Sequence, residues 1–221
     1  MIDAVFFDMD NTLVDTEWAA AKAVKEVVES YGKQFDKEDE KAVIGLPWRT
    51  IFDNTIEKYQ LPLKRLELKD KVIARKSGIL KNSTRQELPG AVKALRLCAS
   101  RYPVAVVSGS YRKEIEDTVK CLQIDKVIRF FVSNEDVVPG KPAPGPYLEA
   151  ARRLNVNPEK CLVFEDSVVG IESAKTAGMT CIAVEYANEA DFDLSNADSV
   201  IESLETVTDI WLDKLENKMR G

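Results

Sequence analysis

The chain has 221 residues, of which 45% are hydrophobic, and it carries a formal net charge of −6. This length fits one large domain or a core with an insertion, and the hydrophobic content is enough for a substantial core. The negative charge argues against a nucleic-acid partner, because nucleic-acid-binding proteins present a basic face. No apolar run approaches the roughly 18 residues of a membrane span, and the N-terminal run is too short for a signal peptide, so we expect a cytoplasmic location without membrane association.

The absence of histidine narrows the chemistry further. It excludes Ser-His-Asp and Cys-His catalysis, histidine-ligated zinc and histidine general bases, and it leaves acid–base chemistry to carboxylates, lysines and tyrosines. The cysteines form no Cys-x-x-Cys pair, so we expect buried, reduced thiols rather than disulfides or metal ligands. They are Cys98, Cys121, Cys161 and Cys181.

The first predicted element is a buried parallel strand in the apolar run that ends at Phe7. Apolar side chains then recur at helical spacing over residues 16–32, and Gly32 is a helix-stop signal. Residues 36–85 are charged and helical in character, with two further amphipathic helices and no convincing strand. Their charge run at 36–41 is typical of a solvated helix face. This part of the chain therefore predicts a helical insert.

From residue 88 onward, apolar strands and helices alternate. The alternation predicts an α/β fold, a Rossmann-like, doubly wound and mainly parallel sheet wrapped by helices. We expect a core of residues 1–14 and 88–221 and an insert of residues 15–87. The predicted strands are 104–107, 127–132, 161–164, 180–184 and 199–201, and the predicted helices are 89–97, 111–122, 144–154, 167–177 and 204–218.

Two carboxylates, Asp8 and Asp10, directly follow the first strand. Ligands of open α/β sheets bind just past the carboxyl ends of strands, and alternate residues of an extended segment point the same way. Two like charges at one site are tolerated when a cation lies between them or when one group is protonated. Although an Asp-x-Asp pair is common, this position favours a metal-binding or catalytic role.

Three later segments also carry polar groups at predicted strand ends or in the loops that follow. Ser108-Gly109-Ser110 offers a hydroxyl and backbone amides for an oxyanion, although taken alone this segment is better interpreted as an ordinary helix N-cap by Ser110. Lys141 lies in a proline-rich turn, where a lysine is usually solvated. Glu165 and Asp166 are oxygen ligands suited to Mg²⁺, or simply acids that favour a helix N-terminus.

Together these four segments resemble the motifs of the haloacid dehalogenase superfamily, within the group that includes β-phosphoglucomutases and phosphoglycolate phosphatases. The run from Phe6 to Glu17 is similar to the first motif, with Asn11 in place of the usual glycine. Asn tolerates left-handed backbone angles, so we expect the turn to form. Ser108 matches the second motif, the Lys-Pro-x-Pro-x-x-Tyr run from Lys141 the third, and the run 164–167 the fourth. The helical insert has the position and size of the family's cap.

The resemblance implies a phosphoric monoester hydrolase with Asp8 as nucleophile and Asp10 as general acid–base. The reaction would be Mg²⁺-dependent hydrolysis of a small phosphate monoester, in particular a sugar phosphate, through an aspartyl phosphate. Ser108, Gly109 and Lys141 would bind the phosphoryl group. The implied metal ligands are Asp8, Asp10 through its backbone carbonyl, Asp166, and Glu165 either directly or through water.

The insert carries the candidates for substrate specificity. Residues 45–49, Gly-Leu-Pro-Trp-Arg, resemble the family's specificity loop, which makes Arg49 a candidate distal contact with the substrate. A solvated surface arginine is an equally good interpretation, and Lys76 is a weaker candidate. The expected partner is a small phosphorylated metabolite, and no obligate protein partner is evident.

Three other functions compete with a phosphatase. A β-phosphoglucomutase-type phosphomutase usually has a cap histidine, but residues 18–21 are Trp-Ala-Ala-Ala in that region. A phosphonate hydrolase needs a Schiff-base lysine in the early cap, and Lys22 and Lys25 lie in no matching motif. A non-catalytic binding protein is disfavoured because all four motifs are intact.

Overall fold

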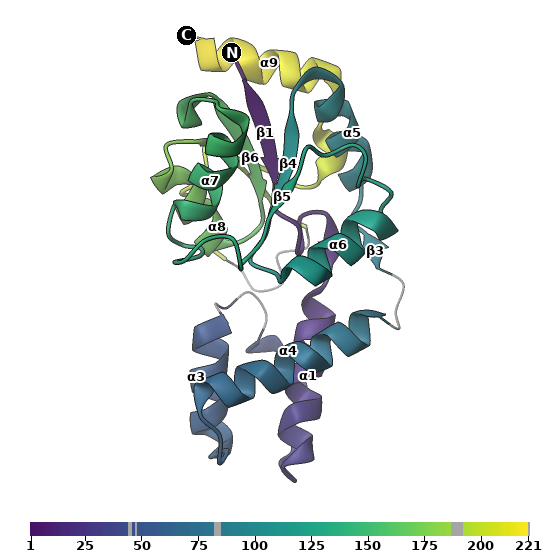
Figure 1. Cartoon of the computed structure of the whole chain (residues 1–221), viewed down its shortest axis with the longest axis vertical. Helices are drawn as coiled ribbons and strands as arrows, with labels where there is room; N and C mark the ends of the chain where they lie inside the picture. The colour runs from purple at the N-terminus through teal and green to yellow at the C-terminus, as the bar shows by residue number, and fades with distance from the viewer. Residues whose placement is uncertain (44–45, 47, 82–84, 187–191, 221) are drawn as a thin grey trace. The chain divides into compact units, whose positions relative to one another are not determined.

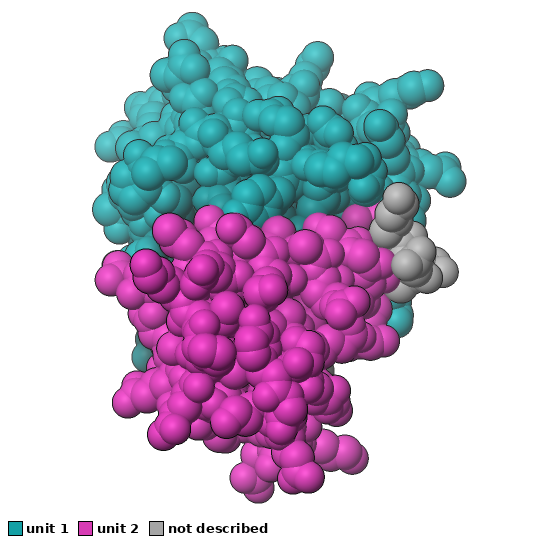
Figure 2. Space-filling view, turned by 60° about the horizontal axis from the view of Figure 1, so that its bottom comes forward, with its two compact units in different colours: residues 1–15, 86–221 teal, residues 16–85 magenta. Residues whose placement is uncertain are grey.

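The computed structural model describes residues 1–43, 46, 48–81, 85–186 and 192–220. These form two compact units, residues 1–15 with 86–221 and residues 16–85, which Figure 2 shows in separate colours. The first unit is an α/β core and the second is a helical insertion between the first strand and the rest of the core. The predicted fold class is therefore confirmed.

A six-stranded sheet forms the centre of the core, and each neighbouring pair of strands is parallel. In spatial order the strands are β5 (Phe131–Val132), β4 (Val104–Val107), β1 (Ala4–Phe7), β6 (Cys161–Glu165), β7 (Thr180–Val184) and β8 (Ser199–Ile201). The chain leaves β1 first toward β4 and β5, and later returns to its other side to add β6, β7 and β8. This reversal of strand order puts the end of β1 at a topological switch point, where open α/β sheets bind ligands.

Helices cover both faces of the sheet, as Figure 1 shows. Phe7 of β1 faces the hydrophobic cluster that includes α5 and α9, whereas Phe6 faces the cluster that includes α7 and α8. Because alternate side chains of a strand point to opposite faces, one apolar run supplies both clusters. The core helices are α5 (Ala91–Arg101), α6 (Arg112–Cys121), α7 (Gly145–Leu154), α8 (Val168–Thr176) and α9 (Asp209–Arg220).

The insertion has its own hydrophobic cluster, to which Val24, Phe52 and Val72 contribute buried side chains. Its helices are α1 (Glu17–Ser30), α2 (Lys37–Lys41), α3 (Trp48–Tyr59) and α4 (Arg65–Lys81). The charge run before and within α2 is not wholly solvated as predicted, because Asp39 is buried and pairs with Lys58 of α3.

Three details of the core differ from the sequence prediction. The predicted strand 127–132 is reduced to β5, because the amides of Val127 and Ile128 both donate to the carbonyl of Ile124 in a turn. The predicted helix 204–218 divides into a short 3₁₀ helix and α9, since Val207 between them has an extended backbone. The short antiparallel ladder between β2 (Val14–Asp15) and β3 (Gln86–Glu87) was not predicted, because two-residue strands carry no periodic signal.

No helix in the part of the chain that the structure describes is long and apolar enough to cross a membrane.

Candidate active site

The loop after β1 presents the two carboxylates of the first motif. The amide of Asp8 donates to the carbonyl of Phe164 at 2.9 Å, which extends the pairing of β1 with β6 by one residue. The chain then turns at Asn11, whose φ of 56° is left-handed, and the amide of Asn11 donates to the carbonyl of Val14. Asn thus provides the backbone angle for which glycine is more usual. The Asp8 side chain is buried at the end of the strand.

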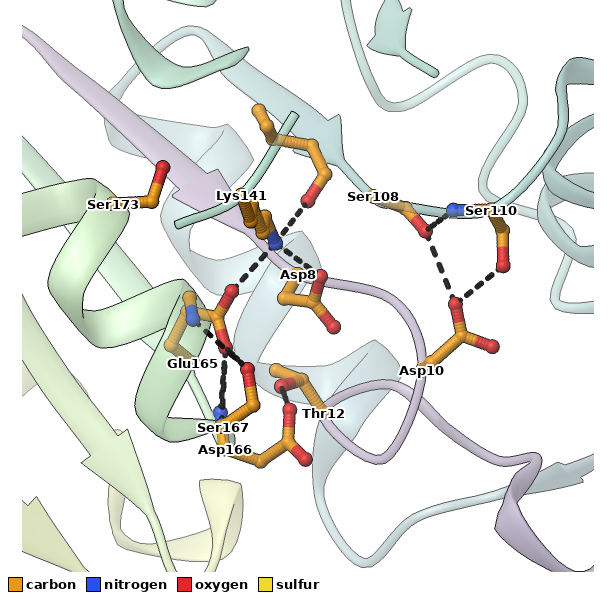
Figure 3. Close-up of polar contacts among 12 residues, drawn as sticks. Asp8, Asp10, Thr12, Ser108, Ser110, Lys141, Glu165, Asp166, Ser167 and Ser173 are labelled. Atoms are coloured by element: carbon orange, nitrogen blue, oxygen red, sulfur yellow. Dashed lines mark hydrogen bonds and ion pairs between the residues drawn. The ribbon is translucent and has the colours of Figure 1, made fainter. Parts of the chain in front are cut away.

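Lys141 reaches this carboxylate from the proline-rich turn (Figure 3). Its Nζ lies 2.6 Å from Asp8 Oδ1, 2.5 Å from Glu165 Oε1 and 3.0 Å from the carbonyl oxygen of Val107. These three acceptors match the three N–H groups of an ammonium. Burial alone lowers the pKa of Lys141, but Asp8 and Glu165 outweigh burial and hold this pKa above its ordinary value. The lysine is therefore buried and charged, unlike the solvated lysine that such a turn usually carries.

Glu165 is held from both sides of its carboxylate. Its Oε1 accepts hydrogen bonds from Lys141 and from the Tyr147 hydroxyl, the latter at 2.9 Å. Its Oε2 accepts from the amides of Asp166 and Ser167 and from the Ser167 hydroxyl. A Cβ on Gly170 would lie 1.7 Å from Glu165 Oε1, so the close packing of α8 on this carboxylate requires glycine there.

The carboxylates of the first and fourth motifs converge. Asp8, Glu165 and Asp166 each place one oxygen within 4.8 Å of the others. Burial raises the pKa of Asp8 well above its ordinary value, Lys141 opposes this rise, and Glu165 and Asp10 add to it. Thr12 donates to Asp166 Oδ1 at 3.1 Å and orients that carboxylate. A set of carboxylate oxygens from two buried residues and one half-buried residue, with excess negative charge, fits a hard divalent cation, so the residues present could hold one.

Asp10 lies on the other side of the loop, toward the second motif (Figure 3). The hydroxyls of Ser108 and Ser110 both donate to Asp10 Oδ2, at 3.1 Å and 2.7 Å. The amide of Ser110 in turn donates to the Ser108 hydroxyl at 2.9 Å. Ser110 is not the N-cap of α6, because that position belongs to Tyr111. Gly109, between the serines, is exposed.

Several polar groups of this site had no role predicted from the sequence, among them Ser110 and Tyr147. Ser110 was considered only within the oxyanion turn or as an N-cap, and its position two residues after Ser108 was the available signal that both hydroxyls share a side. Tyr147 closed the third motif, but its hydroxyl received no role. Burial raises the pKa of Tyr147, and Glu165 raises it further, so the hydroxyl keeps its proton and donates.

The predicted specificity residues belong to the insertion. Arg49 lies in α3 with an exposed side chain, and Gly45 and Pro47 of the predicted loop lie outside the described residues. Lys76 of α4 is buried, with its Nζ 5.8 Å from the ring centroid of Trp48, which is a cation–π arrangement.

Known proteins share both the sequence and the fold of this chain. A phosphorylated carbohydrates phosphatase of Thermotoga maritima is 35% identical over 185 residues, which cover 80% of this chain and 82% of the relative. A fructose-1-phosphate phosphatase of Escherichia coli is 35% identical over 181 residues, which cover 81% of this chain and 95% of the relative. The solved structure of β-phosphoglucomutase from Clostridium difficile has the same fold, with a TM-score of 0.81, 21% identity, and coverage of 99% of this chain and 98% of that chain.

The family assignment rests on a match over most of the chain. A sequence model of the family described as haloacid dehalogenase-like hydrolase matches residues 5–184, from β1 to the end of β7. The two curated relatives are phosphatases that share about a third of their aligned residues with this chain. The chain therefore belongs to the haloacid dehalogenase-like hydrolase family, as its four motifs predicted, and it is a phosphoric monoester hydrolase.

Proposed function

We propose that this protein is a Mg²⁺-dependent phosphatase that hydrolyses a small sugar phosphate through an aspartyl phosphate on Asp8. The observation that carries the proposal is the buried contact of 2.6 Å between Asp8 and Lys141, beside a cluster of carboxylates at the carboxyl ends of β1 and β6. A carboxylate nucleophile divides one difficult displacement into two easier steps.

In the first step, Asp8 attacks phosphorus and the bond from phosphorus to the alcohol oxygen breaks. The leaving oxygen takes a proton from Asp10, and the phosphoryl group becomes bonded to the Asp8 carboxylate. In the second step, Asp10 takes a proton from a water molecule, and that water attacks phosphorus. The bond to Asp8 breaks, inorganic phosphate leaves, and both carboxylates return to their initial states.

The oxygens of the transferring phosphoryl group need positive charge and hydrogen-bond donors. Lys141 supplies an ammonium, Ser108 a hydroxyl and Gly109 a backbone amide, all near the end of β1 or β4. Mg²⁺, held by Asp8, Asp166 and the backbone carbonyl of Asp10, with Glu165 as a direct or water-mediated ligand, would neutralise charge on the same oxygens.

A sugar phosphate is the proposed substrate because the names of the two relatives specify phosphorylated carbohydrates and fructose 1-phosphate. Arg49 and Lys76, both in the insertion, are the cationic side chains that we propose for contacts with the distal part of the substrate. Binding energy from such remote groups orients a substrate at the reacting centre.

A panel of phosphorylated sugars and other small phosphate monoesters tests the proposal, with released phosphate as the measurement. We expect Mg²⁺-dependent release, fastest from a sugar phosphate and absent in Asp8→Asn. A parallel assay follows β-glucose 1-phosphate with a trace of glucose 1,6-bisphosphate, and measures glucose 6-phosphate as well as phosphate. Rapid formation of glucose 6-phosphate with little phosphate release would instead assign a phosphomutase.

A further inference from the structure

The buried hydroxyl of Tyr147 donates a hydrogen bond to Glu165, which contacts Lys141 beside the proposed nucleophile Asp8. We propose that Tyr147 is a positioning residue that fixes the carboxylate of Glu165 and, through it, the ammonium of Lys141 beside Asp8. The proposal rests on the phosphatase activity proposed above. It adds a residue that acts on the reaction without touching the substrate.

Tyr147 contacts both members of the ion pair next to the nucleophile. Its side chain is fully buried in the first half of α7, and its hydroxyl donates to Glu165 Oε1 at 2.9 Å. Its ring centroid lies 5.0 Å from Lys141 Nζ, a distance at which the ring face attracts a cation. One rigid aromatic side chain thus contacts the carboxylate and the ammonium together.

Glu165 needs this contact because its two oxygens are fixed by different elements. Oε2 is held locally by donors from residues 166 and 167, and these contacts do not themselves fix the position of Oε1. Oε1 is shared between Tyr147 and Lys141, and of these two only Tyr147 is part of a helix. Without the Tyr147 hydroxyl, Glu165 Oε1 would be held in place only by the flexible side chain of Lys141, which Glu165 itself orients.

Lys141 depends on Oε1 in turn. Its three N–H groups donate to Asp8, Glu165 and the carbonyl of Val107. If Glu165 Oε1 is displaced, one of the three hydrogen bonds that fix the position of the ammonium is lost. A displacement of about 1 Å at a group that stabilises transferring charge reduces turnover strongly. We therefore expect Tyr147 to affect the rate of the chemical step more than the binding of substrate.

The experiment compares Tyr147→Phe with Tyr186→Phe. Phe keeps the aromatic ring near Lys141 and removes only the hydroxyl. Tyr186 is the matched control, because its hydroxyl also bridges parts of the core, donating to the Pro89 carbonyl and accepting from the Leu204 amide, and neither of these partners is a proposed catalytic group. The measurements are kcat and KM with p-nitrophenyl phosphate and Mg²⁺, thermal unfolding, and a crystal structure of each variant.

We expect kcat to fall about tenfold in Tyr147→Phe, with KM changed less than twofold and with the contact between Lys141 and Glu165 lengthened or lost. Tyr186→Phe should keep kcat within twofold even if its melting temperature falls. An unchanged contact, an unchanged kcat, or an equal loss in both variants would overturn the positioning role. If the wild-type protein hydrolyses no phosphate ester, the proposed function fails, and the crystal structures alone decide whether Tyr147 fixes the contact.

Discussion

The charged groups of the core and of the insertion lie in opposite environments. At the end of β1, Asp8, Lys141 and Glu165 are buried and share a few short contacts, so each charge depends on its neighbours. In the insertion, pairs such as Lys25 with Glu40 and Arg65 with Asp53 are partly exposed to solvent. Exposed pairs contribute little to stability, whereas removal of one partner from a buried network leaves an uncompensated charge. Substitutions in the core site should therefore change activity, whereas substitutions of the insertion's ion pairs should change little.

Substitution of Asp8, the proposed nucleophile, should give the largest effect. Asp8→Asn should reduce turnover to below about 1% of wild type, because an amide is a poor nucleophile and a weak metal ligand. The fold should be retained, since burial disfavours the charged form of Asp8 and the amide is neutral. Steady-state kinetics and thermal unfolding check both parts. Asp53→Asn, at an exposed pair of the insertion, is the control and should leave both unchanged.

Removal of divalent metal should have an effect of similar size. EDTA should abolish turnover, Mg²⁺ should restore it, and Ca²⁺ should substitute poorly, because Mg²⁺ keeps a tight octahedron whereas larger Ca²⁺ admits additional ligands. Phosphate release in metal-free buffer with each ion added back is the measurement. Full turnover in EDTA would contradict the proposed ligand roles of Asp8 and Asp166.

A single methyl group at Gly170 should reduce activity by about two orders of magnitude. In Gly170→Ala the new Cβ would overlap Glu165 Oε1, and the five hydrogen bonds on that carboxylate leave it no free direction in which to move. Gly78→Ala is the matched control, because Gly78 is an exposed helical glycine of the insertion with nothing within 4 Å of its added Cβ.

Kinetics and chemical denaturation of these two variants are the measurements. Gly170→Ala should also lose about 2 kcal/mol of stability by overpacking, whereas Gly78→Ala should gain about 0.5 kcal/mol, because Ala restricts the unfolded chain. Wild-type kinetics in Gly170→Ala would mean that the Glu165 carboxylate does not need its observed position.

The parts of the fold that were predictable are those in which burial alone fixes the local pattern. Strands β4 and β7 have the predicted bounds, because strands buried in a parallel sheet are short, continuous apolar runs. The edge strand β8 also has its predicted bounds, although its first two residues are exposed. The shortness of β5 and the break before α9 were not predictable, since Val127 and Val207 are as apolar as strand or helix residues and differ only in their tertiary partners.

The candidate site likewise has features that the sequence predicts and features that it does not. The motifs predicted which strand ends and loops carry polar groups, and the topology of the sheet explains why those at residues 8, 141, 165 and 166 converge. The hydrogen bond of Ser110 to Asp10 and the packing of Gly170 on Glu165 join residues far apart in sequence. Such contacts depend on side-chain directions in the folded core, which sequence spacing does not specify.

Substitution of Arg49 tests whether the insertion contributes to activity. Arg49→Ala should lower kcat/KM for the best sugar phosphate at least tenfold and should change hydrolysis of p-nitrophenyl phosphate less than twofold, because the smaller ester has no distal group to bind. Arg65→Ala, at an exposed arginine that pairs with Asp53, is the control. Equal losses on both esters would place Arg49 at the phosphoryl group or in folding, and no loss on either would favour the solvated surface arginine.

The smallest expected effect concerns Asp39, which is buried in the insertion, as Lys76 is. Burial alone raises the pKa of Asp39, but hydrogen bonds from Lys58 and from the backbone of Asp36 outweigh burial and lower this pKa to about 2. A carboxyl whose pKa is depressed in the folded state stabilises the fold above its unfolded pKa of about 3.9, and this contribution is lost as the pH falls toward 2.

Asp39→Asn should therefore lower stability by about 1 kcal/mol at pH 7, and the difference from wild type should narrow below pH 4. Urea denaturation across this pH range is the measurement. A stability difference that does not change with pH would show that Asp39 acts through its hydrogen bond with the Asp36 amide at the start of α2 rather than through its charge.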